Sequence, residues 1–446
     1  MNHRGTYRVY FLGIGGIGMS ALARYYHHQG AEVSGYDRTP SPLTRQLEDE
    51  GMAIHYEDNP ELLPALIDKV IYTPAVPNDL KEIAEIQRRG LTMQKRAAAL
   101  GEISKNHFTI AVAGTHGKTT TTAMTAHILH DCGHDTTAFI GGIANNFDSN
   151  LLLGNGPDST LVVEADEFDR SFLQLHPGVS VINAIDADHL DIYGDRRHLQ
   201  DSFNAFARLT ERVVIVKEGL EVEADRILRF GFGEHCDYKA EILKTEEGLT
   251  DFTITAEGNS ILVHLPMAGN HNVLNATAAF AAARQVGLQP DNIAQALSTF
   301  QGVKRRFDVH IRTKKYIYID DYAHHPEEIK SCLSAIRASF PNRPITLVFQ
   351  PHLFTRTRDF MEEFAESLAM ADNLILLDIY PAREKPIEGI TSQALLEKVN
   401  LNSKSLCPKE QLLNVIAERK PELLVTMGAG DIDRFVEPLK KMIRLW

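Results

Sequence analysis

Apolar strand-like runs alternate with helical patterns along the first hundred residues. Residues 17–29 have the apolar spacing of a helix. The runs that predict strands lie at 7–14, 31–37 and 69–75. Alternating strands and helices are typical of a parallel sheet of the doubly wound type. The pattern breaks at the polar stretch 101–107, so we place a first domain at 1–104.

The alternation restarts in a second segment. Strands are expected at 108–114, 160–166 and 179–185, and helices at 118–131, at roughly 197–209 and from about His271. Short β-like pieces occupy residues 237–265, before the last of these helices. The polar, basic sequence GVKRRF at 302–307 marks the end of this domain, which we place at 105–302.

A third alternation fills residues 303–446. Its expected strands are 315–321, 344–350, 373–380 and 423–431, and its expected helices begin at Pro326, follow Thr357, span 391–399 and close the chain. The sequence therefore predicts three consecutive α/β domains, of which the first and the last are Rossmann-like.

The chain has 446 residues, a formal net charge of −13 and 43% hydrophobic residues. This acidic balance argues against nucleic acid as a partner, and no apolar run approaches the ~18 residues that span a bilayer. We therefore expect neither nucleic-acid binding nor stable membrane association. The four cysteines lack C-x-x-C spacing and indicate neither a zinc site nor a disulfide framework, so we expect a reduced, cytoplasmic protein.

A glycine-rich turn follows the first predicted strand. Gly13, Gly15 and Gly18 fit the pattern G-x-G-x-x-G, Gly16 lies between them, and Asp37 closes the second predicted strand. Such a loop brings backbone N–H groups and a helix N-terminus against a diphosphate. Alone, it predicts a dinucleotide site with Asp37 on a ribose hydroxyl. A tight turn without a ligand is the alternative.

A second glycine-rich loop, AGTHGKTT at 113–120, follows the predicted strand 108–114 and opens a helix. It retains the G-K-T end of a P-loop, although Val112 stands where the usual pattern has its first glycine. In such loops backbone amides surround phosphate oxygens, the lysine neutralises β/γ charge, and the hydroxyl after it can bind Mg²⁺. The residues expected to bind ATP are Gly114, Thr115, His116, Gly117, Lys118, Thr119 and Thr120. We expect ATP as the cofactor, on a central P-loop ATPase domain with a parallel sheet.

Acidic residues close the following strands of this domain. Glu164 is expected to bind magnesium, with Asp166 and Glu167 as alternatives, because the carboxyl ends of parallel strands meet the ligand crevice. His189 lies among aspartates in DADHLD at 186–191. Since Mg²⁺ prefers oxygen ligands, the spacing alone leaves a metal role for His189 open.

Seven motifs, including the second loop, occur in one order along the chain. They are AGTHGKTTT at 113–121, VEADE at 163–167, DADHLD at 186–191, GNHNVLNA at 269–276, RRF at 305–307, DDYAHHP at 320–326 and FQPHLFTRT at 349–357. This set resembles the Mur ligase family of ATP-dependent amide-forming enzymes over most of the chain. With GIGGIGMS near the N-terminus, the chain is most similar to the branch of the family that starts the peptide of peptidoglycan.

The resemblance implies a ligase that joins L-alanine to the lactyl carboxylate of UDP-N-acetylmuramate through an acyl phosphate, giving ADP and phosphate. The first glycine loop would then hold the diphosphate of this UDP-sugar rather than NAD, through Gly13, Gly15, Gly16, Gly18 and Asp37. The third domain would close over ATP and bind the amino acid.

The resemblance also implies roles for single residues. Asn272 and Asn275 would face the adenine, Arg306 a phosphate and Asp321 the ribose; the alternative for the two asparagines is a helix cap. Implied catalytic residues are Lys118, His189, His352 and Arg356; implied amino-acid ligands are His324, His352, Arg356 and Arg358; implied ligands of two Mg²⁺ ions are Thr119, Glu164 and His189. Either His324 or His352 could accept the proton of the alanine ammonium group.

Two positions depart from the family's patterns. Relatives that add later residues carry a carbamylated lysine some fifteen positions after the histidine, whereas no lysine occurs here between His189 and Lys217. This absence resembles the alanine-adding branch and leaves the coordination of the second metal open. Leu353 follows His352 where many members of that branch have arginine, so Arg356 is the preferred partner of the incoming carboxylate.

Three other functions fit parts of the sequence. A ligase that attaches a preformed murein tripeptide to the same UDP-sugar would share many of these motifs. An NAD-linked oxidoreductase would use the first glycine loop, and a P-loop module would hydrolyse ATP to switch a partner. The last two interpretations each leave one of the two glycine loops without a role.

Overall fold

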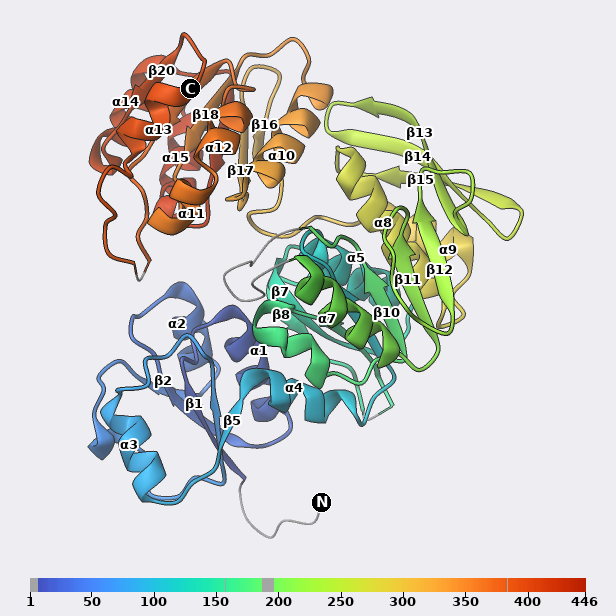
Figure 1. The fold of residues 1–446 in the computed structure, drawn as a ribbon, viewed down its shortest axis with the longest axis vertical. Helices are drawn as coiled ribbons and strands as arrows, with labels where there is room; N and C mark the ends of the chain where they lie inside the picture. Colours follow the sequence, from blue (N-terminus) through green and yellow to red (C-terminus); the bar gives the residue numbers. More distant parts are fainter. Residues whose placement is uncertain (1–6, 157, 187–195, 383) are drawn as a thin grey trace. The chain divides into compact units, whose positions relative to one another are not determined.

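The computed structural model describes residues 7–156, 158–186, 196–382 and 384–446 (Figure 1). The chain forms three β-sheets with helices between their strands. Its residues group into two compact units: Met1–Ala240, Ile254–Ile261 and Asn275–Leu297 in the first, and Glu241–Thr253, Leu262–Leu274 and Ser298–Trp446 in the second. The three consecutive α/β domains expected from the sequence are confirmed as a fold class. No helix within the described ranges is long and apolar enough to cross a membrane.

Five parallel strands form the first sheet, in the order β3-β2-β1-β4-β5. The strands are β1 (Arg8–Leu12), β2 (Glu32–Tyr36), β3 (Ala53–His55), β4 (Lys69–Tyr72) and β5 (Met93–Lys95). The helices are α1 (Ile17–His28), α2 (Pro42–Asp49), α3 (Lys81–Arg88) and α4 (Arg96–Ser104). The predicted strands at 7–14, 31–37 and 69–75 and the predicted helix at 17–29 are confirmed as β1, β2, β4 and α1.

Helix α4 continues into the polar stretch 101–107 and ends at Ser104. Ser104 is buried, and its hydroxyl donates to the carbonyl of Gly101 at 2.7 Å. Gly101 packs against the Gln174 carbonyl so closely that a Cβ would lie 2.3 Å from that oxygen. The polar residues of this stretch therefore belong to a packed helix end.

The second sheet has ten strands, in the order β15-β14-β13-β12-β11-β10-β6-β9-β7-β8. The strands are β6 (Thr109–Ala113), β7 (Thr136–Ala144), β8 (Ser149–Leu152), β9 (Thr160–Glu164), β10 (Val179–Ile182), β11 (Val213–Lys217), β12 (Ile227–Gly231), β13 (Tyr238–Glu246), β14 (Leu249–Ala256) and β15 (Asn259–Leu265). The helices are α5 (Lys118–Asp131), α7 (Arg196–Arg208), α8 (Asn270–Arg284) and α9 (Pro290–Ser298), with a 3₁₀ helix η2 (Phe168–Gln174). The sequence did not predict the antiparallel pair β7–β8.

The third sheet has six strands, in the order β16-β17-β21-β18-β19-β20, and only β16 is antiparallel to its neighbour. The strands are β16 (Asp308–Arg312), β17 (Ile317–Asp321), β18 (Ile345–Phe349), β19 (Asn373–Leu376), β20 (Lys404–Leu406) and β21 (Leu423–Met427). The helices are α10 (Pro326–Ser339), α11 (Phe354–Asp359), α12 (Met361–Leu368), α13 (Ser392–Lys398), α14 (Leu412–Arg419) and α15 (Val436–Ile443). The helix expected after Thr357 begins earlier, at Phe354, because the chain turns at Leu353.

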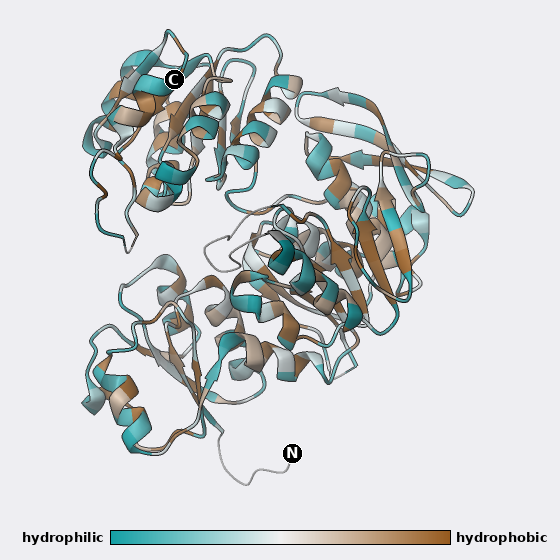
Figure 2. Cartoon of the chain, in the orientation of Figure 1, coloured by the Kyte–Doolittle hydropathy of each residue, from teal (hydrophilic) through white to brown (hydrophobic). Residues whose placement is uncertain are grey.

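The central strands are apolar on both faces, which is the pattern of a parallel sheet covered by helices. All residues of β6 and β10 are buried, and β10, labelled in Figure 1, is coloured mainly as hydrophobic in Figure 2. Aromatic rings fill the space beside this sheet: Phe172 stacks on Phe206 with ring centroids 4.8 Å apart and meets Phe203 edge-on at 5.3 Å. This packing fixes η2, which follows the acidic end of β9.

Helix α1, which opens at the first glycine loop, is fastened to β8 by buried polar contacts. Asn150 accepts from the Arg24 guanidinium at 2.7 Å and donates to the Ile17 carbonyl at 2.5 Å and the Ser20 hydroxyl at 2.9 Å. The Asn150 side chain is fully buried. These bonds fix the start of α1 relative to the central sheet.

Asn150→Ala is expected to lower the free energy of unfolding by about 2 kcal/mol. The substitution removes three hydrogen bonds in a buried place, each worth about 0.5–1.5 kcal/mol. Denaturant titration would measure the change, with the exposed Asn259 changed to alanine as the control. Equal stability of the two variants would contradict a fastening role for Asn150.

Candidate functional site

The first glycine loop turns tightly after β1 and is closed by Asp37. The backbone N–H of Gly13 donates to the Tyr36 carbonyl at 2.8 Å, and Gly13 has a left-handed φ of 82°. The N–H of Gly15 donates to the Asp37 carboxylate at 2.8 Å, and a Cβ on Gly15 would lie 2.6 Å from Thr44. Asp37, predicted to bind the ligand, therefore binds the loop backbone itself.

A pocket of ≈ 260 Å³ lies between this loop and the acidic end of β9. It is lined by Gly16, Ile17, Gly18, Met19, Ala21, Leu22, Thr73, Arg96, Leu100, Phe139, Ile140, Gly141, Glu164 and Asp166. Its charged members are Arg96, Glu164 and Asp166, and the Arg96 guanidinium lies 3.5 Å from the Asp166 carboxylate. A Cβ on Gly18 would lie 2.7 Å from the Arg96 guanidinium, so this cation stands directly at the loop. The pocket brings the first glycine loop and Glu164 to one place.

The second glycine loop requires glycine at two places. Gly114 has φ of 132°, and a Cβ there would lie 2.8 Å from the Ala184 nitrogen. Gly117 precedes α5 with φ of 80°, and a Cβ there would lie 2.5 Å from the Asn275 side-chain oxygen. Thr121 donates to that same oxygen at 3.2 Å and accepts from Asn183 at 2.9 Å. Asn275, predicted to face adenine, therefore lies directly against the phosphate-binding turn.

Asn272, the other residue expected near adenine, donates its side-chain N–H to the Ala268 carbonyl at 2.8 Å. Its side chain is almost fully buried within the first turn of α8. This bond satisfies a carbonyl just before the helix, but it is not a helix cap, because the side chain donates to a carbonyl instead of accepting from a helix N–H.

Lys118, the first residue of α5, is held by a buried carboxylate. Its ammonium group donates to Glu167 at 2.8 and 2.9 Å and to the Gly114 carbonyl at 2.7 Å. Burial alone lowers the pKa of Lys118, but the carboxylates of Glu167, Asp166 and Glu164 outweigh it and raise the pKa overall. Lys118 therefore stays a cation, as a phosphate-binding lysine must.

Thr115, His116, Thr119 and Thr120 complete the loop. The Thr115 hydroxyl accepts from the Asp186 N–H at 3.1 Å, and the His116 ring lies 3.7 Å from the Asp186 carboxylate. Thr119 and Thr120 are buried at the start of α5. The loop backbone and these side chains converge at the carboxyl end of the central sheet, which is where ligands bind in open α/β sheets.

Glu164 ends β9, and its position depends on a glycine of the neighbouring strand. Gly141 donates its N–H to the Glu164 carboxylate at 3.1 Å, and a Cβ on Gly141 would lie 2.1 Å from that oxygen. The Glu164 carboxylate and the Thr119 hydroxyl are oxygen ligands of the type that Mg²⁺ prefers, so both residues fit a magnesium role. His189 lies outside the described residues. Among the described residues no group of three His, Cys, Asp or Glu has the geometry of a metal site.

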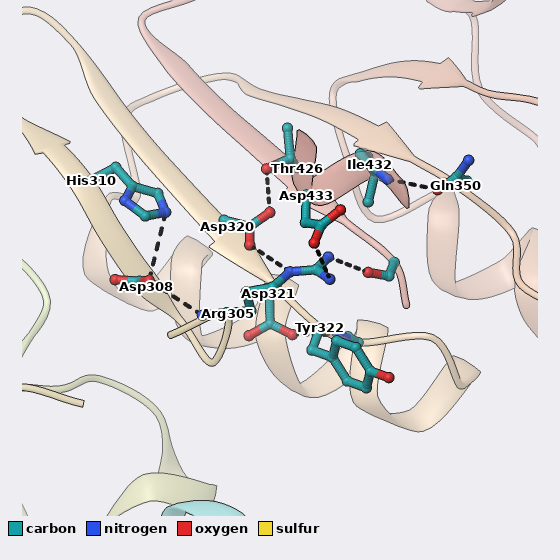
Figure 3. A network of polar contacts seen from close by, with 12 residues as sticks. Arg305, Asp308, His310, Asp320, Asp321, Tyr322, Gln350, Thr426, Ile432 and Asp433 are labelled. Atoms are coloured by element: carbon teal, nitrogen blue, oxygen red, sulfur yellow. Dashed lines mark hydrogen bonds and ion pairs between the residues drawn. The ribbon is translucent and has the colours of Figure 1, made fainter. Parts of the chain in front are cut away.

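A polar network in the third sheet holds the 303–307 turn (Figure 3). Arg305 donates to the buried Asp320 carboxylate at 3.1 Å and to the Gly428 carbonyl at 2.5 Å. Thr426 donates to the other oxygen of Asp320 at 2.6 Å, and Arg305 has a left-handed φ of 63°. The guanidinium of Arg305, the first arginine of the RRF motif, is thus bound by other groups of the protein.

Arg306 shares the Tyr322 ring with Arg305, whose guanidinium lies 5.2 Å from the ring centroid. The Arg306 guanidinium lies over the same ring, 5.1 Å from the centroid, and 3.8 Å from Glu328. Asp321, predicted to bind ribose, accepts from the N–H groups of Phe307 at 2.6 Å and Ala323 at 2.7 Å. Asp321 therefore binds the backbone just after Arg306 and, separately, the backbone just after Tyr322.

The free energy of unfolding is expected to fall between pH 4 and pH 6 because of Asp321. Burial raises the pKa of Asp321 to about 6, and Arg306 and the two backbone N–H groups offset this only in part. An aspartate in an unfolded chain titrates near 3.9, so the folded protein holds this proton more tightly. The stabilisation is complete below about pH 4 and is lost as the pH rises through about 6.

Denaturant titrations of the wild type and Asp321→Asn at pH 4, 5, 6 and 7 would test this prediction. The stability difference between the two proteins should change across this range, with the wild type losing stability relative to the variant as pH rises. A difference that is constant with pH would contradict it.

Histidines predicted for the amino-acid site lie together at the carboxyl end of the third sheet. His324 and His352 have ring centroids 6.1 Å apart, and His352 stacks on Tyr380 at 5.8 Å. Burial lowers the pKa of His352 to about 4, with smaller contributions from His324 and Arg356. Burial also lowers the pKa of His324, although Glu328 opposes it. Both imidazoles are therefore neutral at pH 7 and able to accept a proton.

Arg356 lies in α11 and acts on both imidazoles electrostatically. Arg358, two residues on, pairs instead with its neighbour Asp359 at 2.7 Å and is half exposed. The structure thus associates Arg356 with the histidine cluster and gives Arg358 a different partner.

Four residues of these sites were not assigned from the sequence: Arg96, Gly141, Glu167 in its pairing with Lys118, and Arg305. Arg96 follows a short strand and Gly141 lies in a Gly-Gly pair, and neither matches a motif of known chemistry. The VEADE motif, which lies about 49 residues after Lys118, could have suggested a carboxylate partner for this lysine. Only the fold shows that the partner is Glu167 and not one of the other two acidic residues of the motif.

Comparisons with known proteins give one family for all three parts of the chain. Residues 8–108 match the model described as Mur ligase family, catalytic domain; residues 112–283 match the Mur ligase middle domain; and residues 305–430 match the Mur ligase, glutamate ligase domain.

Similar proteins carry ligase names. The chain is 46% identical to a UDP-N-acetylmuramate–L-alanine ligase of Cytophaga hutchinsonii, over 99% of this chain and 97% of that protein. It is 47% identical to a protein of the same name from Flavobacterium johnsoniae, over 99% of both chains. The crystal structure of a UDP-N-acetylmuramate-alanine ligase from Thermotoga maritima has 29% identity and a TM-score of 0.84, covering 97% of this chain and 99% of that one. A murein peptide ligase from Psychrobacter arcticus has 25% identity and a TM-score of 0.75, covering 98% of both.

Proposed function

Because the chain belongs to the Mur ligase family, we propose that it joins L-alanine to the lactyl carboxylate of UDP-N-acetylmuramate in peptidoglycan synthesis, with ATP converted to ADP and phosphate. The observation that carries the substrate assignment is the near-full-length identity of 46–47% to ligases with this name. The glycine loops, the pocket and the histidine cluster are consistent with it.

The order of steps follows from the chemistry of the substrates. A carboxylate is a poor electrophile, so it first attacks the γ-phosphate of ATP and forms an acyl phosphate and ADP. The amine of L-alanine then attacks the acyl carbon, and phosphate leaves from the tetrahedral intermediate. Lys118 and the backbone N–H groups of residues 114–119 stabilise the charge on the transferring phosphoryl group. Magnesium, held through Thr119 and Glu164, would supply further neutralisation of that charge.

We assign the sugar nucleotide to the pocket below the first glycine loop. Gly13, Gly15, Gly16 and Gly18 present backbone and a helix N-terminus to a diphosphate. Arg96 supplies a cation for an anionic substrate in a pocket that otherwise holds the carboxylates of Glu164 and Asp166. The carboxyl group that reacts would therefore approach Glu164, next to the phosphate-binding loop.

The amino acid is assigned to the cluster of His324, His352 and Arg356. A guanidinium suits the carboxylate of L-alanine, and a neutral imidazole can take the proton that its ammonium group must lose. The low pKa of His352 makes it a weak base, so His324 is an equal candidate for this proton transfer. His189 is kept as a proposed magnesium ligand on the family resemblance alone.

We further propose domain limits of 1–104 for the sugar nucleotide, 105–302 for ATP and 303–446 for the amino acid, and a cytoplasmic site of action, where ATP and nucleotide sugars are available. Each of the three family models matches a stretch that falls mainly in one of these domains.

Acceptor comparison is the experiment that tests the function. L-Alanine, L-serine, glycine and a murein tripeptide are each offered with UDP-N-acetylmuramate and ATP, while phosphate release and product mass are followed. We expect L-alanine to be used with the highest kcat/KM. Preference for the tripeptide would instead assign the chain to murein peptide recycling, and phosphate release without an amino acid would contradict ligase function.

A further inference from the structure

Lys118 has no hydrogen-bonding capacity left for a phosphate. An ammonium group has three N–H donors. In this structure they meet both oxygens of Glu167, at 2.8 and 2.9 Å, and the Gly114 carbonyl at 2.7 Å. A nucleotide phosphate that binds the Lys118 nitrogen must therefore displace at least one of these acceptors.

Glu167 is the acceptor that resembles a phosphate. It is negatively charged and lies fully buried, while the Lys118 side chain is only 13% exposed, so the pair is shielded from water. The Gly114 carbonyl belongs to the loop itself and can stay in place when a ligand binds. Carboxylate and phosphate oxygens compete for the same cation in such a setting.

The backbone holds Glu167 at this position. Asp169 and Arg170 both adopt left-handed φ values, 52° and 53°, which non-glycine residues rarely adopt. The N–H of Arg170 donates to the Glu167 carbonyl at 2.9 Å, and the N–H of Phe168 donates to the Asp166 side chain at 3.1 Å. Strained backbone of this kind persists where the surroundings fix it, often at functional sites.

The start of α4 fixes the same segment from the other side. Lys95 pairs with Asp169 at 2.8 Å, and Arg96 lies 3.5 Å from Asp166. Glu167 therefore lies between two carboxylates that pair with Lys95 and Arg96 at the start of α4. The contact of Glu167 with Lys118 therefore belongs to a buried set of contacts that fixes this segment.

We propose that Glu167 is a positioning residue that holds Lys118 in the place of the nucleotide phosphates until they bind. The role rests on the proposed function only in taking Lys118 as a nucleotide-binding residue. It keeps the buried lysine charged and correctly placed, and it lowers nucleotide affinity because the ion pair must open before the phosphates bind.

Binding of ADP and of pyrophosphate, measured by calorimetry without divalent cations, tests this role. A contact of Glu167 with a metal cannot contribute under these conditions. Glu167→Gln should bind both ligands at least about tenfold more tightly than the wild type, since a bond from Lys118 to a neutral amide oxygen is weaker than the ion pair that the phosphates must displace. The free variant should melt at a lower temperature, because Lys118 loses its buried partner, and ADP should raise its melting temperature by more than in the wild type.

Two further variants sharpen the test. Glu234→Gln is the matched control, since it neutralises an exposed glutamate that pairs with Lys239 at 2.6 Å and not with Lys118; its ADP affinity should equal that of the wild type. Glu167→Asp keeps the charge but shortens the side chain, so it should tighten ADP binding by less than Glu167→Gln. This variant also carries the test if the glutamine variant does not fold.

Unchanged or weaker ADP binding in Glu167→Gln would overturn the proposal. Lys118→Ala separates its failure from that of the proposed function. If the wild type binds ADP and Lys118→Ala does not, an unaltered affinity in Glu167→Gln overturns the role of Glu167 alone. If Lys118→Ala binds ADP as well as the wild type, the nucleotide site at this loop is wrong, and the role of Glu167 with it.

Discussion

Lys118→Ala is expected to lower kcat for ATP-dependent ligation by about 10³-fold or more and to leave the binding of UDP-N-acetylmuramate nearly unchanged. The lysine is the buried cation of the phosphate-binding loop, and transition states of phosphoryl transfer depend on such charges. The sugar nucleotide is assigned to a different pocket, which Lys118 does not line. Initial rates of phosphate release, together with calorimetry of UDP-N-acetylmuramate binding, would measure both effects.

The exposed Lys105, changed to alanine, is the control for loss of a positive charge. It should retain the wild-type rate. If Lys118→Ala loses ATP and sugar-nucleotide binding to the same degree, the two ligands do not use separate sites. Circular dichroism would show whether the carboxylate of Glu167, left without its partner, has destabilised the fold.

Gly141→Ala is expected to reduce kcat/KM by about 100-fold and to raise the Mg²⁺ concentration needed for half-maximal activity. A methyl group at this position would lie 2.1 Å from an oxygen of Glu164 and 2.5 Å from its carboxyl carbon. Glu164 must then leave its place and lose the bond from the Gly141 N–H. Displacement by an ångström or more of a carboxylate that we propose as a metal ligand is large compared with what catalytic geometry tolerates.

A magnesium titration of the rate would show this effect. Gly156→Ala is the matched control, because a Cβ at Gly156 meets no atom within 4 Å. An unaltered Mg²⁺ dependence of the rate in Gly141→Ala would contradict the assignment of Glu164 as a metal ligand.

The parallel strands and the two glycine loops could be predicted because their signals are local. The helix expected at 118–131 has the same bounds as α5, since a phosphate-binding loop fixes its start and Gly133 follows its end. Strands β1, β6 and β10 read as short apolar runs because helices cover both faces of a parallel sheet. The antiparallel pair β7–β8 gave no such signal, because glycines and polar residues interrupt its apolar positions.

The contacts that decide the chemistry could not be predicted because they join distant residues. Nothing local in the sequence pairs Lys118 with Glu167 rather than with Glu164 or Asp166. Leu353 is a second example: the departure from arginine was visible, but the structure adds that this residue has a left-handed φ of 71° and that its N–H donates to the Tyr380 carbonyl at 2.9 Å. The prediction for His189 lies outside the described residues.

Asp166 and Glu167 are consecutive, and each has a cationic partner on a different ligand pocket. A sugar nucleotide that recruits Arg96 and a nucleotide that recruits Lys118 draw on the same two residues of one rigid segment. By thermodynamic reciprocity, the factor by which the first ligand changes the affinity for the second equals the factor by which the second changes the affinity for the first. Dissociation constants for the two ligands are measured with the other ligand absent and with it saturating. They therefore yield a single interaction energy, which is the same whichever substrate binds first.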